Sequence, residues 1–402
     1  MKYDFDTVFE RKGHDAAAFD AIGSARKDAP SAPMDGFSVI PMWIADMNFR
    51  TCPSVKKAII ERAEYDTMGY FSPYDTYYDA IIQWHNARKP VDGLEPVHIA
   101  YHNGVLGGVI SALNVLCSRG DPVLVNAPTY AGFINCLKAN GYNIIPSFLR
   151  LNNRDTWQID FDDMEKKIKD NNIHVFILCS PHNPCGRVWT GEELIRILDI
   201  CRKYEVYVIS DEIWSDLIMP GHRHIPTQSV NEYARERTIA LYAPTKTFNT
   251  AGLVGSYSIV FNKFLRDRLE RESELCSYNE MNVLSMHALM GAYSPDGSAW
   301  TDELIHVLDK NATDVVNFFR NDISDIKVAK PEGTYMLLID CTDYCASHSL
   351  TISDVIKAGW NVGLAWADGR FFNAPCHLRL NVALPQTLLN EAMKRMQEYV
   401  FT

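Results

Sequence analysis

Short apolar runs alternate with longer amphipathic stretches through the middle of the chain. The runs at 175–179 and 206–209 contain no charged residue, which is typical of strands that are buried on both faces. Alternation of strands with helices predicts right-handed crossovers and a mostly parallel sheet covered by helices on both faces. The predicted strands are 122–126, 142–148, 174–180, 206–210 and 238–242, and the predicted helices between them are 130–140, 162–171 and 191–204.

The pattern changes on both sides of this region. Residues 1–38 are polar and irregular, and the apolar stretch 39–45 leads out of them. We therefore expect 1–50 to form an N-terminal arm and part of a small domain, 51–292 a large domain, and 293–402 a smaller α+β C-terminal domain. Beyond residue 262 the predicted helices are 263–275, 282–292, 302–319, 352–358 and 385–399, and the predicted strands are 336–339 and 378–383.

Two helices and a glycine-rich turn are predicted ahead of the alternating region. Pro53 opens a helix at 53–64, and a second helical pattern from Tyr74 to His85 carries an aromatic stripe that predicts core or subunit packing. Tyr70 lies outside that stripe and remains available to a site. The turn at 103–108 precedes a helix at 109–116, where backbone N–H groups could hold a phosphate, although a plain tight turn is an equal alternative.

Composition narrows the class of protein. The 402 residues are 47% hydrophobic and 22% charged, as in soluble globular proteins, and the net charge of -11 with no long basic run disfavours nucleic acid and anionic membranes as partners. No apolar run suggests a signal core or a membrane span. The ten cysteines include no Cys-x-x-Cys pair, so we expect a cytoplasmic protein in a reducing compartment.

Three polar residues follow predicted buried strands. Asn183 follows 174–180, Asp211 follows 206–210 and Lys246 follows 238–242. The carboxyl ends of parallel strands share one edge of a sheet, so these side chains should meet. A buried Asp211 requires a cationic partner, and desolvation of Lys246 would leave a neutral amine able to react with an aldehyde. Taken alone, Lys246 would be read as a solvated loop residue.

The ordered motifs around these residues resemble the pyridoxal 5'-phosphate enzymes of fold type I, the aspartate aminotransferase superfamily of class I/II. The resemblance covers nearly the whole chain and implies a seven-stranded, mostly parallel sheet sandwiched by helices. Within that superfamily, the chain resembles the subgroup that includes the MalY and PatB cystathionine β-lyases. The residues that suggest this subgroup are 41–47, 243–249 and 368–372. The ordered motifs are Gly69-Tyr70, Gly104-Val105-Leu106, Pro128-Thr129-Tyr130, Asn183-Pro184-x-Gly186-Arg187, Asp211-Glu212, Thr245-Lys246 and Arg379-Leu380-Asn381.

The resemblance implies roles around the cofactor ring. Lys246 would hold the cofactor aldehyde and then move the substrate α-proton as the general base. Asp211 would keep the ring nitrogen protonated. Asn183 would donate to the phenolic oxygen and take part in substrate binding, and Tyr130 would stack on the ring.

Further residues would hold the phosphate and the substrate. The amides of Val105 and Leu106 and the hydroxyl of Thr245 would bind the phosphate, joined by Tyr70 from a second subunit. Arg379 would bind the substrate carboxylate through two parallel hydrogen bonds. The resemblance therefore implies a homodimer with its sites at the interface.

Four positions depart from the pattern. Trp214 stands where the subgroup usually has His and where other aminotransferases often have Tyr. Val254 stands near a frequent phosphate-binding Arg, and Asn48 replaces a frequent Asp. Cys185 replaces a frequent Thr and is interpreted as a packing residue, because no activating base is evident nearby. His222-Arg223-His224 has a possible metal-ligand spacing, but a solvated loop is the better reading and no metal is expected.

Three functions are compatible with these residues. The first is β-elimination from a sulfur-containing L-amino acid such as cystathionine or cysteine, which releases a thiol, pyruvate and ammonia. The second is transamination, which uses the same residues but needs an oxo acid. The third, a regulatory binding module on a cofactor fold, is disfavoured because such a module would not require Lys246, Asp211, Asn183 and Arg379 together.

Overall fold

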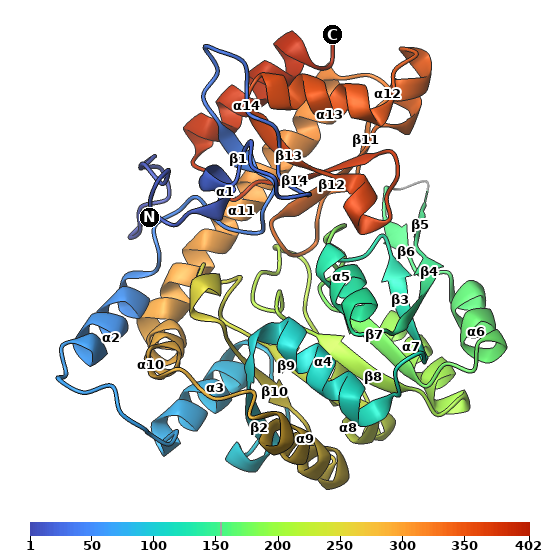
Figure 1. The fold of residues 1–402 in the computed structure, drawn as a ribbon. Helices are drawn as coiled ribbons and strands as arrows, with labels where there is room; N and C mark the ends of the chain where they lie inside the picture. Colours follow the sequence, from blue (N-terminus) through green and yellow to red (C-terminus); the bar gives the residue numbers. More distant parts are fainter. Residues whose placement is uncertain (153–154) are drawn as a thin grey trace.

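The computed structural model describes residues 1–152 and 155–402, and its larger sheet has seven strands (Figure 1). Five neighbouring strands are mutually parallel, and β10 is antiparallel to β9 and to β2 at the edge. The predicted α/β fold with a mostly parallel seven-stranded sheet is confirmed. In sheet order the strands are β2 (Ile99–Asn103), β10 (Gly255–Ile259), β9 (Thr238–Tyr242), β8 (Tyr207–Asp211), β7 (Val175–Cys179), β3 (Pro122–Ala127) and β4 (Asn143–Phe148).

Helices cover both faces of this sheet, as the alternating pattern predicts. One apolar cluster joins the sheet to α4, α5 and α9, and a second joins it to α6, α7 and α8. Helices α2, α3 and α10 pack together beside the edge at β2 (Figure 1). These helices are α2 (Pro53–Ala63), α3 (Asp75–Arg88), α4 (Gly104–Leu116), α5 (Ala131–Ala139), α6 (Phe161–Asp170), α7 (Gly191–Lys203), α8 (Glu232–Arg237), α9 (Lys263–Cys276) and α10 (Val283–Ala292).

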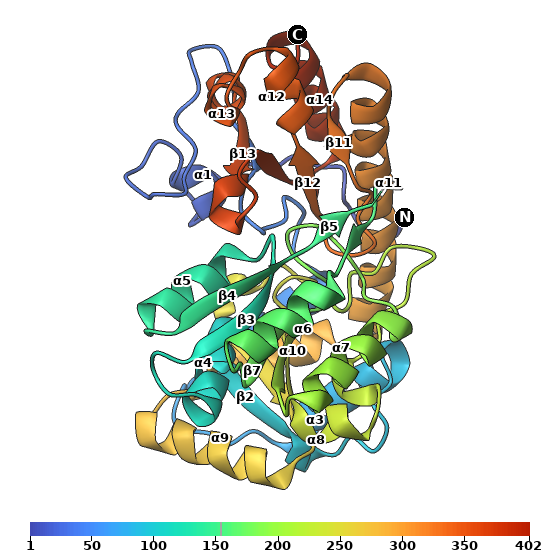
Figure 2. The ribbon, with the colours of Figure 1, turned by 90° about the vertical axis from the view of Figure 1, so that its right-hand side faces the viewer.

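A second sheet of five strands forms the smaller part of the molecule (Figure 2). Its first strand, β1, comes from the N-terminal arm and pairs in parallel with β13, so both ends of the chain contribute to it. The predicted domain boundaries after residues 50 and 292 stay a prediction. The sheet order is β1 (Ile40–Met42), β13 (Leu364–Asp368), β14 (His377–Asn381), β12 (Met336–Asp340) and β11 (Lys327–Val328), and its helices are α1 (Ala17–Asp20), α11 (Pro295–Asp322), α12 (Thr342–Ser347), α13 (Ile352–Asn361) and α14 (Gln386–Tyr399).

Helix α11 is longer than its predicted span of 302–319. Ser294 caps its start by accepting a hydrogen bond from the Gly297 amide, and Pro295 occupies the first turn. The added residues 295–301 begin Pro-Asp-Gly-Ser, which shows no helical apolar periodicity. The helix runs along one side of the molecule in Figure 2 and contacts β11 and α14 in the smaller part and α2 and α10 in the larger part.

Strands β2 and β10 are the clearest departures from the predicted elements. Strand β2 reads Ile-Ala-Tyr-His-Asn and β10 reads Gly-Ser-Tyr-Ser-Ile, so neither has a continuous apolar run. Strand β10 is largely buried, whereas β2 at the edge buries only Ile99 and His102. Polar groups pair between the two strands: Ser256 Oγ donates to the His102 carbonyl at 2.9 Å, and Ser258 Oγ lies 2.9 Å from His102 Nε2. Burial costs little free energy when a polar side chain keeps a hydrogen-bond partner, so a strand at this position needs no apolar pattern.

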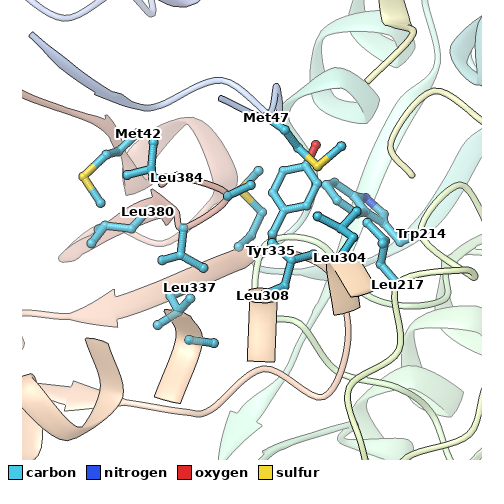
Figure 3. Close-up of a cluster of buried hydrophobic side chains, with 14 of the residues drawn as sticks. Met42, Met47, Trp214, Leu217, Leu304, Leu308, Tyr335, Leu337, Leu380 and Leu384 are labelled. Carbon is cyan, nitrogen blue, oxygen red and sulfur yellow. The ribbon is translucent and has the colours of Figure 1, made fainter. Parts of the chain in front are cut away.

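The largest apolar cluster continues from the large sheet into the smaller one beneath the strand ends. Trp214, Tyr335 and Met47 lie together in it, with Leu304 and Leu308 from α11 (Figure 3). The rings of Trp214 and Tyr335 meet edge to face, with centroids 4.8 Å apart. This packing holds the two sheets in place relative to each other, and the candidate site residues lie between them. Within the described parts of the chain, none of the helices combines the length and apolar character needed to cross a bilayer.

Candidate active site

The carboxyl ends of β7, β8 and β9 meet around a cavity of about 190 Å³. Asn183 follows β7, Asp211 ends β8 and Lys246 follows β9, so adjacent parallel strands bring these side chains together as the sequence predicts. A wider cavity of about 420 Å³ adjoins it, sharing Tyr130 and Lys246. Of the other predicted site residues, the narrower cavity is lined by Val105, Leu106 and Thr245, and the wider one by Arg379.

Lys246 is a partly buried amine with one hydrogen-bond partner described in the structure. Its Nζ donates to the Ala45 carbonyl at 3.1 Å. Burial, and secondarily the charge of Arg379, lower the pKa of Lys246 to about 8. The loop that carries it is tied to the N-terminal arm, because the Asn249 amide bonds both the N–H and the carbonyl of Met47 at 3.0 Å. The arm thereby closes one side of the site.

Asp211 is a buried carboxylate that faces the narrower cavity. Its Oδ1 accepts a hydrogen bond from the Ile213 amide at 3.1 Å, and burial raises its pKa to about 7. The ammonium group of Lys246 acts in the opposite direction but does not offset the burial. A carboxylate held here without a close cation would be stabilised by a positively charged ligand atom in the cavity.

Glu212, next to Asp211 in the chain, is a fully buried carboxylate that is not among the predicted site residues. Its Oε2 accepts from Tyr242 Oη at 2.6 Å and lies 2.7 Å from His224 Nε2, while its Oε1 accepts from the Thr227 amide at 2.8 Å. Although burial acts to raise the pKa of Glu212, its pairing with His224 and these hydrogen bonds hold it below the ordinary value. His224 is thus buried and paired, which corrects the prediction for this residue, whereas His222 and Arg223 are exposed as the predicted solvated loop requires.

Arg379 lies on β14 and reaches the site from the smaller sheet. Its Nη2 donates to the Trp43 carbonyl at 2.5 Å, its Nη1 to Asn183 Oδ1 at 3.3 Å, and its guanidinium lies 4.2 Å from the Phe372 ring centroid. Burial lowers the pKa of Arg379 to about 10. It forms no ion pair with any carboxylate of residues 1–152 and 155–402, and its Nε has no partner there. A buried unpaired guanidinium favours an anionic ligand.

The first turn of α4 lines the narrower cavity opposite Asp211. Asn103, at the cap position, makes no side-chain cap hydrogen bond to this helix. The first amides of a helix have no partner within it, and the helix dipole adds positive potential at that end. Gly104 takes a positive φ of 75° at the turn, and Val105 and Leu106 follow at the cavity wall. This end of α4 can receive a phosphate.

Tyr70 is not brought to either cavity by its own chain. It lies between α2 and α3, with its side chain fully exposed. Tyr65, Met68 and Tyr74 are also exposed in this region, whereas Tyr77 is buried in the core. The predicted aromatic stripe therefore divides into a core part and a surface part.

The four departures have distinct surroundings. Trp214 and Val254 line the narrower cavity, and Lys246 Nζ lies 5.8 Å from the Trp214 ring centroid. Asn48 is buried and accepts from Arg11 Nη1 at 2.8 Å. Cys185 is buried, and burial raises its pKa to about 12, which keeps it a thiol and agrees with a packing role. No group of three potential metal-ligating side chains occurs among the described residues.

The model of the family "Aminotransferase class I and II" matches residues 39–396. The chain belongs to this family. The curated protein cystathionine β-lyase PatB of Bacillus subtilis is 30% identical over 396 residues, which cover 98% of each chain. The inferred resemblance to the PatB subgroup is thereby confirmed.

Two solved structures of family members agree with this chain over their length. The C-S lyase from Staphylococcus hominis, described as bound to pyridoxal phosphate, has a TM-score of 0.89 and 28% identity, and the alignment covers 100% of this chain and 99% of that one. A putative aminotransferase from Clostridium difficile, also described with pyridoxal phosphate, has a TM-score of 0.89 and 30% identity, with 98% and 99% covered. One of these two similar proteins is therefore named as a C-S lyase and the other as a putative aminotransferase.

Proposed function

We propose that this chain is a pyridoxal 5'-phosphate-dependent carbon–sulfur β-lyase. Its substrates would be L-amino acids of the cystathionine or cysteine type, and its products a thiol, pyruvate and ammonia. The observation that carries the proposal is that a desolvated lysine, Lys246, and a buried unpaired arginine, Arg379, line one cavity. The full-length similarity to PatB and to a C-S lyase supports the reaction type.

The donor set of the narrower cavity fits pyridoxal phosphate. The uncapped start of α4 and Thr245 suit the phosphate, Asp211 suits a protonated ring nitrogen, and Tyr130 lies at the wall where a ring could stack. Asn183 can donate to a phenolic oxygen, since its Oδ1 accepts from Arg379. When bound, the cofactor supplies an aldehyde that condenses with amines and a ring that accepts the electron pair left by deprotonation.

The residues of this chain then control position and proton transfer. Arg379 binds the substrate carboxylate and fixes the orientation of the α-carbon. With the cofactor bound, Lys246 would accept the α-proton on Nζ, and its lowered pKa favours the neutral amine that this role requires. The same Nζ–H can donate to the departing sulfur, so that a thiol leaves from the β-carbon without a second substrate.

Transamination is the alternative, and the similarity to a putative aminotransferase favours it. It uses the same base and the same arginine, but it requires an oxo acid to complete the cycle. Product identification tests the lyase proposal. The cofactor-loaded protein should convert L-cystathionine to homocysteine, pyruvate and ammonia in equal amounts, whereas an amino acid product formed from an added oxo acid would instead identify a transaminase.

The pH dependence of cofactor loading follows from the pKa of Lys246. Only the neutral amine condenses with an aldehyde, and the pKa of about 8 lies below the ordinary 10.5. We expect the rate at which cofactor-free protein incorporates pyridoxal phosphate to rise with pH and to level off above about pH 8. Absorbance of the bound cofactor measures this rate. A rate that continues to rise to pH 10 would contradict a desolvated lysine.

We further propose a homodimer in which Tyr70 completes the site of the partner. The exposed Tyr70 and the apolar residues near it support this assignment. Two inactive variants, Tyr70→Ala and Lys246→Ala, should recover about a quarter of wild-type activity when refolded together, because half the dimers are mixed and each has one intact site. If Tyr70 acts within its own chain, or has no role, the activity of the refolded mixture will not exceed the average of the activities of the two variants refolded separately.

A cytoplasmic location is proposed on the basis of the cysteines. All ten are free in the structure, and a reducing compartment would keep them so.

A further inference from the structure

The wider cavity has room beyond the residues assigned to the reaction. Lys246, Tyr130 and Arg379 form one part of its wall, and Arg26 and Asp28 from the N-terminal arm form another. Its volume of about 420 Å³ lies within the range of pockets that enclose whole small molecules. A substrate bound by Arg379 can therefore extend toward the arm.

Arg26 and Asp28 form a geometrically matched ion pair on this wall. Arg26 Nε donates to Asp28 Oδ1 at 2.6 Å, and Nη2 donates to Oδ2 at 2.9 Å. The two side chains are 46% and 44% exposed, so the pair stays open to a ligand. The guanidinium of Arg26 lies 4.9 Å from the Trp43 ring centroid, which limits its orientation.

The ion pair of Arg26 and Asp28 interacts electrostatically with Arg379. The pKa of Asp28 is held below its ordinary value mainly by Arg26, and the charge of Arg379 contributes in the same direction. Asp28 in turn acts to raise the pKa of Arg379. These charges are thus close enough to act on a single bound molecule.

We infer that Arg26 and Asp28 recognise the distal end of a substrate that carries a second amino-acid zwitterion beyond the sulfur, as L-cystathionine does. Arg26 binds the distal carboxylate and Asp28 accepts hydrogen bonds from the distal ammonium. A zwitterion can enter by exchanging partners with the existing pair, whereas an apolar S-substituent leaves that pair closed. This inference rests on the proposed function and narrows its substrate class.

Three substrates that differ only at the distal carbon separate the two contacts. They are L-cystathionine, S-(3-carboxypropyl)-L-cysteine, which lacks the distal ammonium, and S-propyl-L-cysteine, which lacks both charged groups. Arg26→Gln should raise KM about tenfold for the first two, in line with the loss of a hydrogen bond to a charged group. Asp28→Asn should raise KM for L-cystathionine only. Neither variant should change kcat or affect S-propyl-L-cysteine.

Two further variants control for charge and for geometry. Lys12→Gln removes a positive charge from an exposed position of the same arm and should leave all three KM values unchanged. Arg26→Lys should recover part of the affinity for the distal carboxylate. An equal loss for all three substrates, or no loss for L-cystathionine, would overturn the inference. Wild-type turnover of S-propyl-L-cysteine tests the lyase function separately, since it requires neither Arg26 nor Asp28.

Discussion

Lys246→Ala is expected to lower kcat/KM for L-cystathionine by about 10⁴-fold, the upper range for the loss of a positioned general base. The variant removes both the amine that holds the cofactor aldehyde and the group that accepts the α-proton. Thermal unfolding should change little, because Lys246 forms a single hydrogen bond to a backbone carbonyl and no ion pair in the described parts of the chain. Release of pyruvate measures the effect.

An exposed lysine gives the matched control for this variant. Lys166 lies on the surface of α6 and pairs only with Asp170 in the residues described, so Lys166→Ala should retain wild-type activity. If the Lys246→Ala protein kept more than a tenth of the wild-type rate, Lys246 could not be the base, and the proposed mechanism would be wrong.

Asp211→Asn is expected to have the second largest effect. Removing one member of a buried charge pair costs roughly 3–5 kcal/mol, which corresponds to a loss of about a hundredfold to several thousandfold in rate if that cost falls on the reacting complex. Asparagine keeps the size of the side chain but cannot hold a proton on the ring nitrogen. The absorbance of bound cofactor should also change, and that readout would not respond to a general loss of stability.

Asp199 provides the corresponding control, since it is exposed on α7 and far along the helix from the strand ends. Asp199→Asn should behave as wild type. Activity of the Asp211→Asn protein within threefold of wild type, together with an unchanged cofactor spectrum, would show that Asp211 does not pair with the ring.

The central strands and their polar ends are predictable because the relevant signal is local. The apolar runs of β7, β8 and β9 specify burial on both faces, and parallel pairing then requires Asn183, Asp211 and Lys246 to meet at one edge. Neither the cavity nor the lysine pKa is needed for this inference. The start of α4 is likewise marked by its glycines.

The remaining parts of the site depend on contacts between distant segments. Ala45 and Arg379 approach Lys246 from opposite ends of the chain, and the polar arm that carries Arg26 shows no pattern of its own. The buried polar groups of β10 pair with His102 of β2, and a search for apolar runs cannot detect such pairing. The role proposed for Tyr70 requires a second copy of the chain, and a contact between two copies leaves no pattern in a single sequence.

Counting turnovers in the absence of an oxo acid tests the central claim most directly. Cofactor-loaded protein is incubated with excess L-cystathionine, and pyruvate and free thiol are followed together. The lyase account expects equimolar release that continues over many turnovers per site. Release that stops at or below one equivalent per site, and resumes only when an oxo acid is added, would contradict it and identify the chain as an aminotransferase.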